Sequence, residues 1–324
     1  MSSKTIAAGT ARPAPASTGK NSPLATAFKK IKRHWQLYLI FLVPLAVVLI
    51  FSYGPMYGLQ IAFKDFMASK GIVGSPWVGL KHFRSFITSY QFPRLLGNTL
   101  GISIYSLLAG FPIPVLLALM INECGNAKFK KSVQMVSYAP HFISTVIMVS
   151  ILLMFLSPRS GFINNVVALF GGERIDFIAK PEYFKSLYVW SGIWQNMGYS
   201  SIIYIAALAG IDPALHEAAV VDGASKLRRI WHIDIPGILP TVIIMLILDC
   251  GKLMNVGYEK VLLMQNSLNM SSSDIISTFV YRMGLEQAQY SFSTAVGLFN
   301  SVINTVLLVA VNQVARKCSE TSLF

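Results

Sequence analysis

The side chains in this sequence that are most able to do chemistry lie inside long apolar runs. Asp249 and Lys252 are one helical turn apart in one run, and Asn255 continues along the same sector. Asn300 and Asn304 are likewise one turn apart in a later run. Polar groups are costly in such surroundings and usually face a wet path or one another. These residues therefore predict contact with a polar ligand or, for Asp249 and Lys252, an internal ion pair that holds helices together.

A second group of residues combines aromatic faces with amides. Trp194, Asn196 and Tyr199 lie in another apolar run, close to Trp190 and Gln195. Aromatic rings stack on sugar rings and amides hydrogen-bond to hydroxyls, so this mixture indicates a path for a saccharide. A belt of aromatic residues at a membrane interface has the same composition and is the alternative interpretation. Glycines and serines along these runs are more simply explained as positions of close helix packing.

Motifs for metal or nucleotide chemistry are missing from the sequence. The cysteines, Cys124, Cys250 and Cys318, lack CxxC or metal-ligand spacing, and the histidines are scattered. There is no GxxxxGKS or GxxxxGKT loop to hold phosphates. We therefore expect no catalytic site, no metal and no cofactor in this chain, and any ATP that drives it would bind to another chain.

The elements that position these residues are predicted to be membrane helices. Hydrophobic residues make up 54% of the sequence and charged residues only 13%, far from the composition of a soluble domain. A helix of about 20 apolar residues crosses a bilayer, and a barrel strand would need only about 10 residues of alternating character. We therefore predict an all-α membrane protein with about six transmembrane helices, near residues 37–63, 95–121, 135–156, 186–210, 238–258 and 292–315.

Charge around the first run predicts the orientation. Lys29, Lys30, Lys32 and Arg33 stand directly before it, and no acidic residue precedes Asp65. Because lysine and arginine are retained on the cytoplasmic side, both termini are expected in the cytoplasm. The net charge of +13 is then explained by lysines and arginines that determine the topology and attract anionic lipid headgroups. No nucleic-acid-binding module is visible in the sequence.

The two ends of the chain are expected to be tails around one domain. Residues 1–34 form a basic tail rich in Ala, Ser, Thr, Pro and Gly, which predicts disorder; a mitochondrial transit peptide is the alternative. Residues 35–318 form the predicted six-helix domain, and residues 319–324 form a short C-terminal tail.

The segment 212–236 between the fourth and fifth runs predicts a helix, a turn and a second helix. Asp212 and the following proline are typical of a helix start, Gly223 permits a sharp turn, and Ser225 can cap the second helix. Pro236 is expected to end that helix. Leu215 and Ile230 are candidates to anchor the segment. An amphipathic hairpin lying on the lipid surface is the alternative interpretation.

The spacing in this segment resembles the EAA loop of permease subunits from ATP-binding cassette importers. It reads EAAVVDG from Glu217 to Gly223 and, after nine residues, IDIP ending at Pro236, with Ile235 in place of leucine. The stretches KHFRSFI, YAPHFIST, NVGYEKVLLM and YSFSTAVGLFNSVIN extend the resemblance over about residues 35 to 320. They resemble the oligosaccharide and polysaccharide permeases of the type I class, among which alginate-import permeases are the most similar.

The resemblance implies a type I importer permease fold and a set of partners. This chain would pair with a second, related permease, and their shared cavity would carry a saccharide such as alginate. Two ATPase subunits would bind ATP and Mg, and an extracytoplasmic binding protein would meet the outer loops in a bacterial inner membrane. The residues that this implies for coupling to the ATPase are Glu217, Ala218, Ala219, Asp222, Gly223, Ala224 and Pro236.

Three alternatives remain open on the sequence. A secondary transporter would need coupling-ion ligands near mid-membrane, and only Asp249 with Lys252 is available there. A structural subunit of a membrane complex would need neither a wet path nor the EAA loop. An importer for a non-sugar solute would carry a related loop, so only the wider resemblance favours saccharides.

Overall fold

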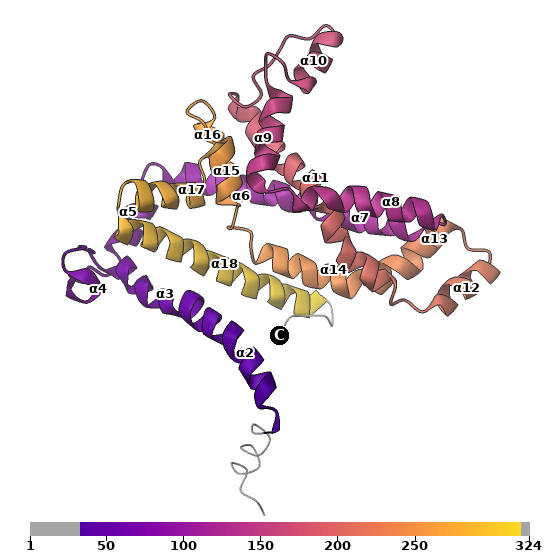
Figure 1. Ribbon diagram of the computed structural model, residues 1–324, viewed down its shortest axis with the longest axis horizontal. Coiled ribbons are helices and arrows are strands. Elements are labelled where there is room, and N and C mark those ends of the chain that lie inside the picture. The colour runs from indigo at the N-terminus through magenta and orange to yellow at the C-terminus, as the bar shows by residue number, and fades with distance from the viewer. Residues whose placement is uncertain (1–32, 319–324) are drawn as a thin grey trace, which may run out of the picture. The chain divides into compact units, whose positions relative to one another are not determined.

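The computed structural model describes residues 33–318, and most of them belong to helices (Figure 1). The only strand-like pairing in that range is an isolated bridge between Lys64 and Trp77. The predicted all-α class is therefore confirmed. Nearly all of the predicted tail 1–34, and the tail 319–324, lie outside the described residues. The chain divides into two compact units, one up to Gly58 and one from Leu59 onward.

The described part of the first unit is one apolar helical stretch. It contains the helices α2 (Trp35–Val48), η1 (Leu49–Tyr53) and α3 (Gly54–Met56), and η1 is a π-helix. No residue of these three helices is buried. Large apolar side chains such as Phe41 and Phe51 are exposed, as expected for a helix whose solvent is lipid.

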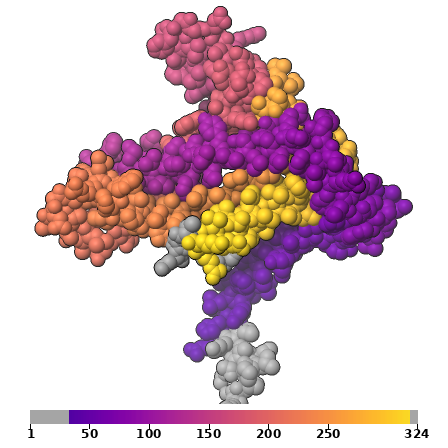
Figure 2. Space-filling view, turned by 180° about the vertical axis from the view of Figure 1, so that it is seen from behind, coloured from indigo at the N-terminus to yellow at the C-terminus, as the bar shows by residue number. Residues whose placement is uncertain are grey.

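The second unit holds the remaining elements. Its long helices are α6 (Phe92–Gly110), α7 (Pro112–Asn122), α8 (Ala127–Tyr138), α9 (Thr145–Leu156), α11 (Pro181–Leu208), α14 (Ile235–Cys250) and α18 (Tyr290–Cys318). Shorter elements join them: η2 (Tyr57–Phe63, which begins at the boundary), α4 (Gly71–Gly74), α5 (Lys81–Ile87), η3 (Ala139–Phe142), α10 (Phe162–Leu169), α12 (Pro213–Val221), α13 (Lys226–Arg229), η4 (Ile230–Asp234), α15 (Tyr258–Met264), α16 (Met270–Ser273), α17 (Ile276–Tyr281) and η5 (Arg282–Glu286). Figure 2 shows α14 and α18 side by side on one face of this unit.

Four helical stretches among the described residues are long and apolar enough to cross a membrane: Trp35–Phe63, Phe92–Asn122, Lys226–Cys250 and Tyr290–Lys317. The number rises to six if each of two bent helix pairs is one span. One pair bends by 101° between Phe142 and Thr145, where Ser144 caps the second helix, and the other bends by 75° between α11 and α12. The predicted run 135–156 is therefore broken, whereas the predicted run 186–210 lies almost entirely within α11.

The fifth predicted span differs from the structure at both ends. Pro236 does not end the preceding helix, because α13, the π-helix η4 and α14 follow one another without a break. A proline lacks the N–H group and crowds the preceding turn, and a wider π turn directly before it relieves both effects. At the other end, the helix stops at Cys250 rather than near residue 258. Lys252 and Asn255 consequently lie beyond it.

Close packing between α11 and α8 depends on one glycine. A Cβ atom added to Gly198 would lie 2.1 Å from the carbonyl oxygen of Ser137, which is backbone and cannot swing aside. We expect Gly198→Ala to destabilise the protein by about 1–3 kcal/mol, as overpacking does. Thermal unfolding in detergent measures this effect. Gly97→Ala in α6 is the control, because nothing lies within 4 Å of its added Cβ; equal melting temperatures for the two variants would contradict the prediction.

Candidate functional site

The loop 212–226 forms the predicted helix, turn and helix start. The Asp212 carboxylate accepts a hydrogen bond from the Ala214 N–H at 2.9 Å and caps α12. Gly223 has a φ of 75°, a left-handed conformation that suits glycine. The Ser225 hydroxyl caps α13 by accepting from the Arg228 N–H at 3.4 Å. Local sequence chemistry was therefore sufficient to predict this geometry.

The exposed side of α12 carries the residues that the sequence singled out for coupling. Glu217 and Ala218 are exposed and Ala219 is half-buried. Within residues 33–318, the Glu217 carboxylate has no hydrogen-bond or ion-pair partner. Val221 is 87% exposed, so α12 presents one free carboxylate among small and apolar side chains.

The turn after α12 is held by backbone hydrogen bonds. The Asp222 N–H donates to the Ala218 carbonyl at 3.0 Å, and the Ala224 N–H donates to the Ala219 carbonyl at 2.9 Å. The Asp222 carboxylate itself is exposed and, within the described range, bonds to nothing. Among the other residues named for coupling, Ala224 is half-buried and Pro236 is exposed in the continuous helix.

Ile230 and His216 make two of the contacts that hold the segment 212–236 in place. Ile230 packs against the apolar cluster of Ala118, Leu119, Tyr204, Leu208 and Ile238, as predicted, whereas Leu215 is 54% exposed and anchors nothing comparable. His216 Nε2 lies 3.3 Å from the Asp234 carboxylate, which is 1% exposed. The second contact could not be foreseen from local sequence, because His216 and Asp234 lie in different helices, α12 and η4.

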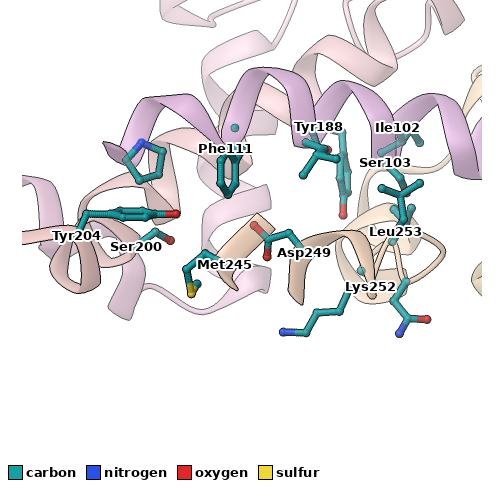
Figure 3. Close-up of a pocket in the computed structure, with 17 residues that line it drawn as sticks. Ile102, Ser103, Phe111, Tyr188, Ser200, Tyr204, Met245, Asp249, Lys252 and Leu253 are labelled. Atoms are coloured by element: carbon teal, nitrogen blue, oxygen red, sulfur yellow. The ribbon is translucent and has the colours of Figure 1, made fainter. Parts of the chain in front are cut away.

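A polar cavity lies between α6, α7, α11 and the end of α14. It holds about 320 Å³ and is lined by Asp249, Lys252 and Asn255 together with serine and tyrosine side chains (Figure 3). Three residues of the predicted substrate path thus share one cavity. Asp249 and Lys252 do not form an ion pair within 4.0 Å, and in Figure 3 the Lys252 side chain extends away from Phe111, toward which Asp249 points. The predicted internal pair is therefore wrong, because the helix ends between the two residues.

A second polar cavity, of about 250 Å³, adjoins the first. Ser106, Tyr188 and Ser200 line both, and Asn196 and Lys260 line only the second. Lys260 was not predicted, because the fifth span was expected to end near residue 258 and the residues after it were assigned to an outer loop. The signal that could have found it is a lone lysine directly before the apolar stretch VLLM.

Of the predicted aromatic and amide group, Asn196 lines the second cavity, and Tyr199 and Trp194 line neither polar cavity. Asn196 bonds to His141 at 2.9 Å, and Tyr199 stacks on the same histidine with ring centroids 3.9 Å apart. Trp194 lines an apolar cavity beside Met148 and Leu187 rather than either polar one. The sequence grouped these three residues, and the structure separates the tryptophan from the other two.

Asn300 and Asn304 meet the chain just after α14 ends. Asn304 Oδ1 accepts from the Met254 N–H at 2.9 Å, and its Nδ2 donates to Asn255 Oδ1 at 3.0 Å. Asn300 Nδ2 donates to the Met254 carbonyl at 3.3 Å. Both amides therefore satisfy backbone groups that a broken helix leaves without partners. Asn300 also lines a third cavity, which Tyr258 and Tyr281 share.

Comparison with known protein families gives one match over most of the chain. A family model described as "Binding-protein-dependent transport system inner membrane component" matches residues 34–320. Protein LplB of Bacillus subtilis (strain 168) is 43% identical over 311 residues, which cover 94% of this chain and 98% of that protein. The polygalacturonan/rhamnogalacturonan transport system permease protein YteP of the same organism is 43% identical over 309 residues, covering 93% of this chain and 96% of that protein.

Solved structures give a match of similar extent. A chain of a bacterial ABC transporter involved in the import of the acidic polysaccharide alginate superposes with a TM-score of 0.83 and 42% identity, covering 90% of this chain and 99% of that chain. A chain of the bacterial alginate ABC transporter in complex with an alginate pentasaccharide-bound periplasmic protein gives a TM-score of 0.83 and 41% identity. The match covers 91% of this chain and 99% of that chain. The predicted fold is thereby confirmed.

Proposed function

The chain belongs to the family of inner membrane components of binding-protein-dependent transport systems, and from this membership we propose that it is a permease subunit of an ATP-driven importer of oligosaccharides or polysaccharides. Acidic saccharides such as alginate are the proposed substrates. The observation that carries the proposal is the likeness, over nearly the whole chain, to a chain of a solved alginate importer. The relative that transports polygalacturonan and rhamnogalacturonan supports the same chemical class.

The loop around α12 is the proposed coupling element. An ATPase subunit on the cytoplasmic side would receive α12 in a groove, where Ala218 and Ala219 allow close approach and Glu217 pairs with a basic group. Exposed ion pairs contribute only about 0–1 kcal/mol, so the role of Glu217 is to set the register of a partly buried joint. The contact between His216 and Asp234 would pass movement of α12 to the helix that carries Asp249.

The proposed assembly contains a second, related permease, two ATPase subunits that bind ATP and Mg, and an external binding protein. The chain would lie in the inner membrane of a bacterium, and both of its termini would lie in the cytoplasm. The solved alginate transporter in complex with a saccharide-bound periplasmic protein supports the proposed external binding protein. The chain itself would hydrolyse nothing.

The adjoining polar cavities are the proposed part of the path that this chain contributes. Serine, tyrosine and asparagine side chains in them offer donors and acceptors for sugar hydroxyls. Sites of this kind bind by a few placed polar groups among apolar walls. Trp194, which lies outside them, would face lipid or the second permease.

Uptake by reconstituted vesicles tests the proposal. The complex is purified through a tag on this chain, placed in proteoliposomes and supplied with its binding protein and fluorescent alginate pentasaccharide. We expect uptake that requires both ATP and the binding protein and that persists when ion gradients are collapsed with ionophores. Uptake driven by an ion gradient without ATP would instead establish a secondary transporter. Uptake of an amino acid or phosphate, with none of any saccharide, would establish an importer for another solute.

A further inference from the structure

Lys260 is a buried lysine whose ammonium group has only neutral partners among the described residues. It lies in α15 with 9% of its surface exposed. Its Nζ donates to the Tyr188 carbonyl at 2.8 Å and stands 4.6 Å from the centroid of the Tyr188 ring. A Cβ atom added to Gly192 would lie 3.2 Å from Nζ. Only one of the three ammonium N–H groups therefore donates a hydrogen bond to another group of the described chain.

The charge of Lys260 is not offset by any acidic side chain in residues 33–318. None of the ion pairs in that range includes it, although Asp249 lines the adjoining cavity. Burial lowers the pKa of Lys260 to about 8, so the group is still mostly protonated at neutral pH. A buried cation without an anion is costly, and an apolar residue in its place would avoid that cost.

The open side of Lys260 faces the cavity of about 250 Å³ that it shares with Ser106, Ser200 and Asn196. The hydroxyls of Ser106 and Ser200 have no hydrogen-bond partner within the described residues. Lys252 is the other cation near the path, but it is exposed and can be solvated. An anion entering this cavity would therefore gain most from Lys260.

We propose that Lys260 is the carboxylate-binding residue of the path, where its ammonium group pairs with the carboxylate of a uronate unit while Ser106 and Ser200 bind the neighbouring hydroxyls. This inference rests on the proposed function and names the residue that makes the path selective for acidic saccharides. A charge-assisted hydrogen bond between an ammonium group and a carboxylate is among the stronger polar contacts. Tyr188 holds the ammonium in place between substrate molecules.

The test compares two pentasaccharides in the reconstituted complex, alginate pentasaccharide and the same chain with its carboxyl groups reduced to alcohols. Each is presented on saturating binding protein. We expect Lys260→Met to lower the ratio of acidic to neutral uptake by about tenfold or more, in line with a lost hydrogen bond to a charged group. Lys260→Arg should retain most of the ratio. Lys131→Met, which removes an exposed charge outside both cavities, should leave it close to wild type.

The other outcomes overturn the proposal in distinguishable ways. If Lys260→Met lowers uptake of both saccharides equally, together with the melting temperature, the residue is structural. If the ratio is unchanged, or if Lys131→Met lowers it as much, carboxylate binding is not the role of Lys260, and the proposed function still stands. If the wild-type complex takes up neither saccharide, the proposed function fails, and the Lys260 site fails with it.

Discussion

Replacing Glu217 by alanine is expected to lower the ATP hydrolysis that loaded binding protein stimulates by about tenfold or more, a typical size for a coupling free energy. Basal hydrolysis and assembly of the complex should change little, because Glu217 is exposed and, within the described part of this chain, supports no other group. The loss follows from register: without the carboxylate, α12 no longer seats in one position against the ATPase. Hydrolysis rates of purified complexes, with and without loaded binding protein, measure it.

Two further variants make this result specific. Glu217→Gln keeps the size and hydrogen-bonding capacity of the side chain, so it should fall between wild type and alanine. Glu286→Ala removes an equally exposed carboxylate from η5 and should behave as wild type. Full stimulation in Glu217→Ala would remove Glu217 from the coupling surface, and a complex that falls apart would assign it to assembly.

Local patterns predicted the loop because each of its features is fixed by neighbours in sequence. A cap such as Asp212, a left-handed glycine such as Gly223 and a capping serine such as Ser225 each act within three residues. The coupling residues could therefore be placed on one short helix without knowledge of the bundle. The error at Pro236 has the same origin, since the rule for proline in a regular helix does not anticipate a π turn directly before it.

The path could be predicted only in part, because its geometry depends on where one helix ends. The fifth span was expected to reach residue 258, but the chain unwinds after Cys250. The amides of Asn300 and Asn304, from a helix far along the chain, satisfy the freed backbone. Asp249 and Lys252, one turn apart by sequence, therefore form no ion pair. For the same reason Lys260 enters a cavity that an uninterrupted helix would not have placed it in.

Asp274 is the site of the largest expected change in stability. Its carboxylate is fully buried and pairs with Arg94 of α6 at 3.1 Å and with Arg282 of η5 at 2.8 Å. Its backbone carbonyl accepts from Asn98 Nδ2 at 3.0 Å. Local sequence patterns do not predict this pairing, because Arg94 comes from a distant segment. One acidic residue thus joins α6 to the segment between α16 and α17.

We expect Asp274→Ala to lower the free energy of unfolding of the protein by about 3 kcal/mol, the lower end of the range for removing one member of a buried ion pair. The lower end applies because Arg94 and Arg282 keep 39% and 22% of their side chains exposed and can partly regain water. Thermal unfolding of the purified complex in detergent measures the change.

Asp65→Ala is the matched control for this prediction. Asp65 forms an ion pair with Lys81 at 2.7 Å, shorter than either contact of Asp274, but the two side chains are 32% and 61% exposed. If distance alone set the contribution of an ion pair, Asp65→Ala would be the more damaging change. Because exposed charges regain water on losing a partner and buried ones do not, we expect the reverse order. Equal melting temperatures for the two variants would show that water reaches Asp274 and that this buried centre does not hold the segment in place.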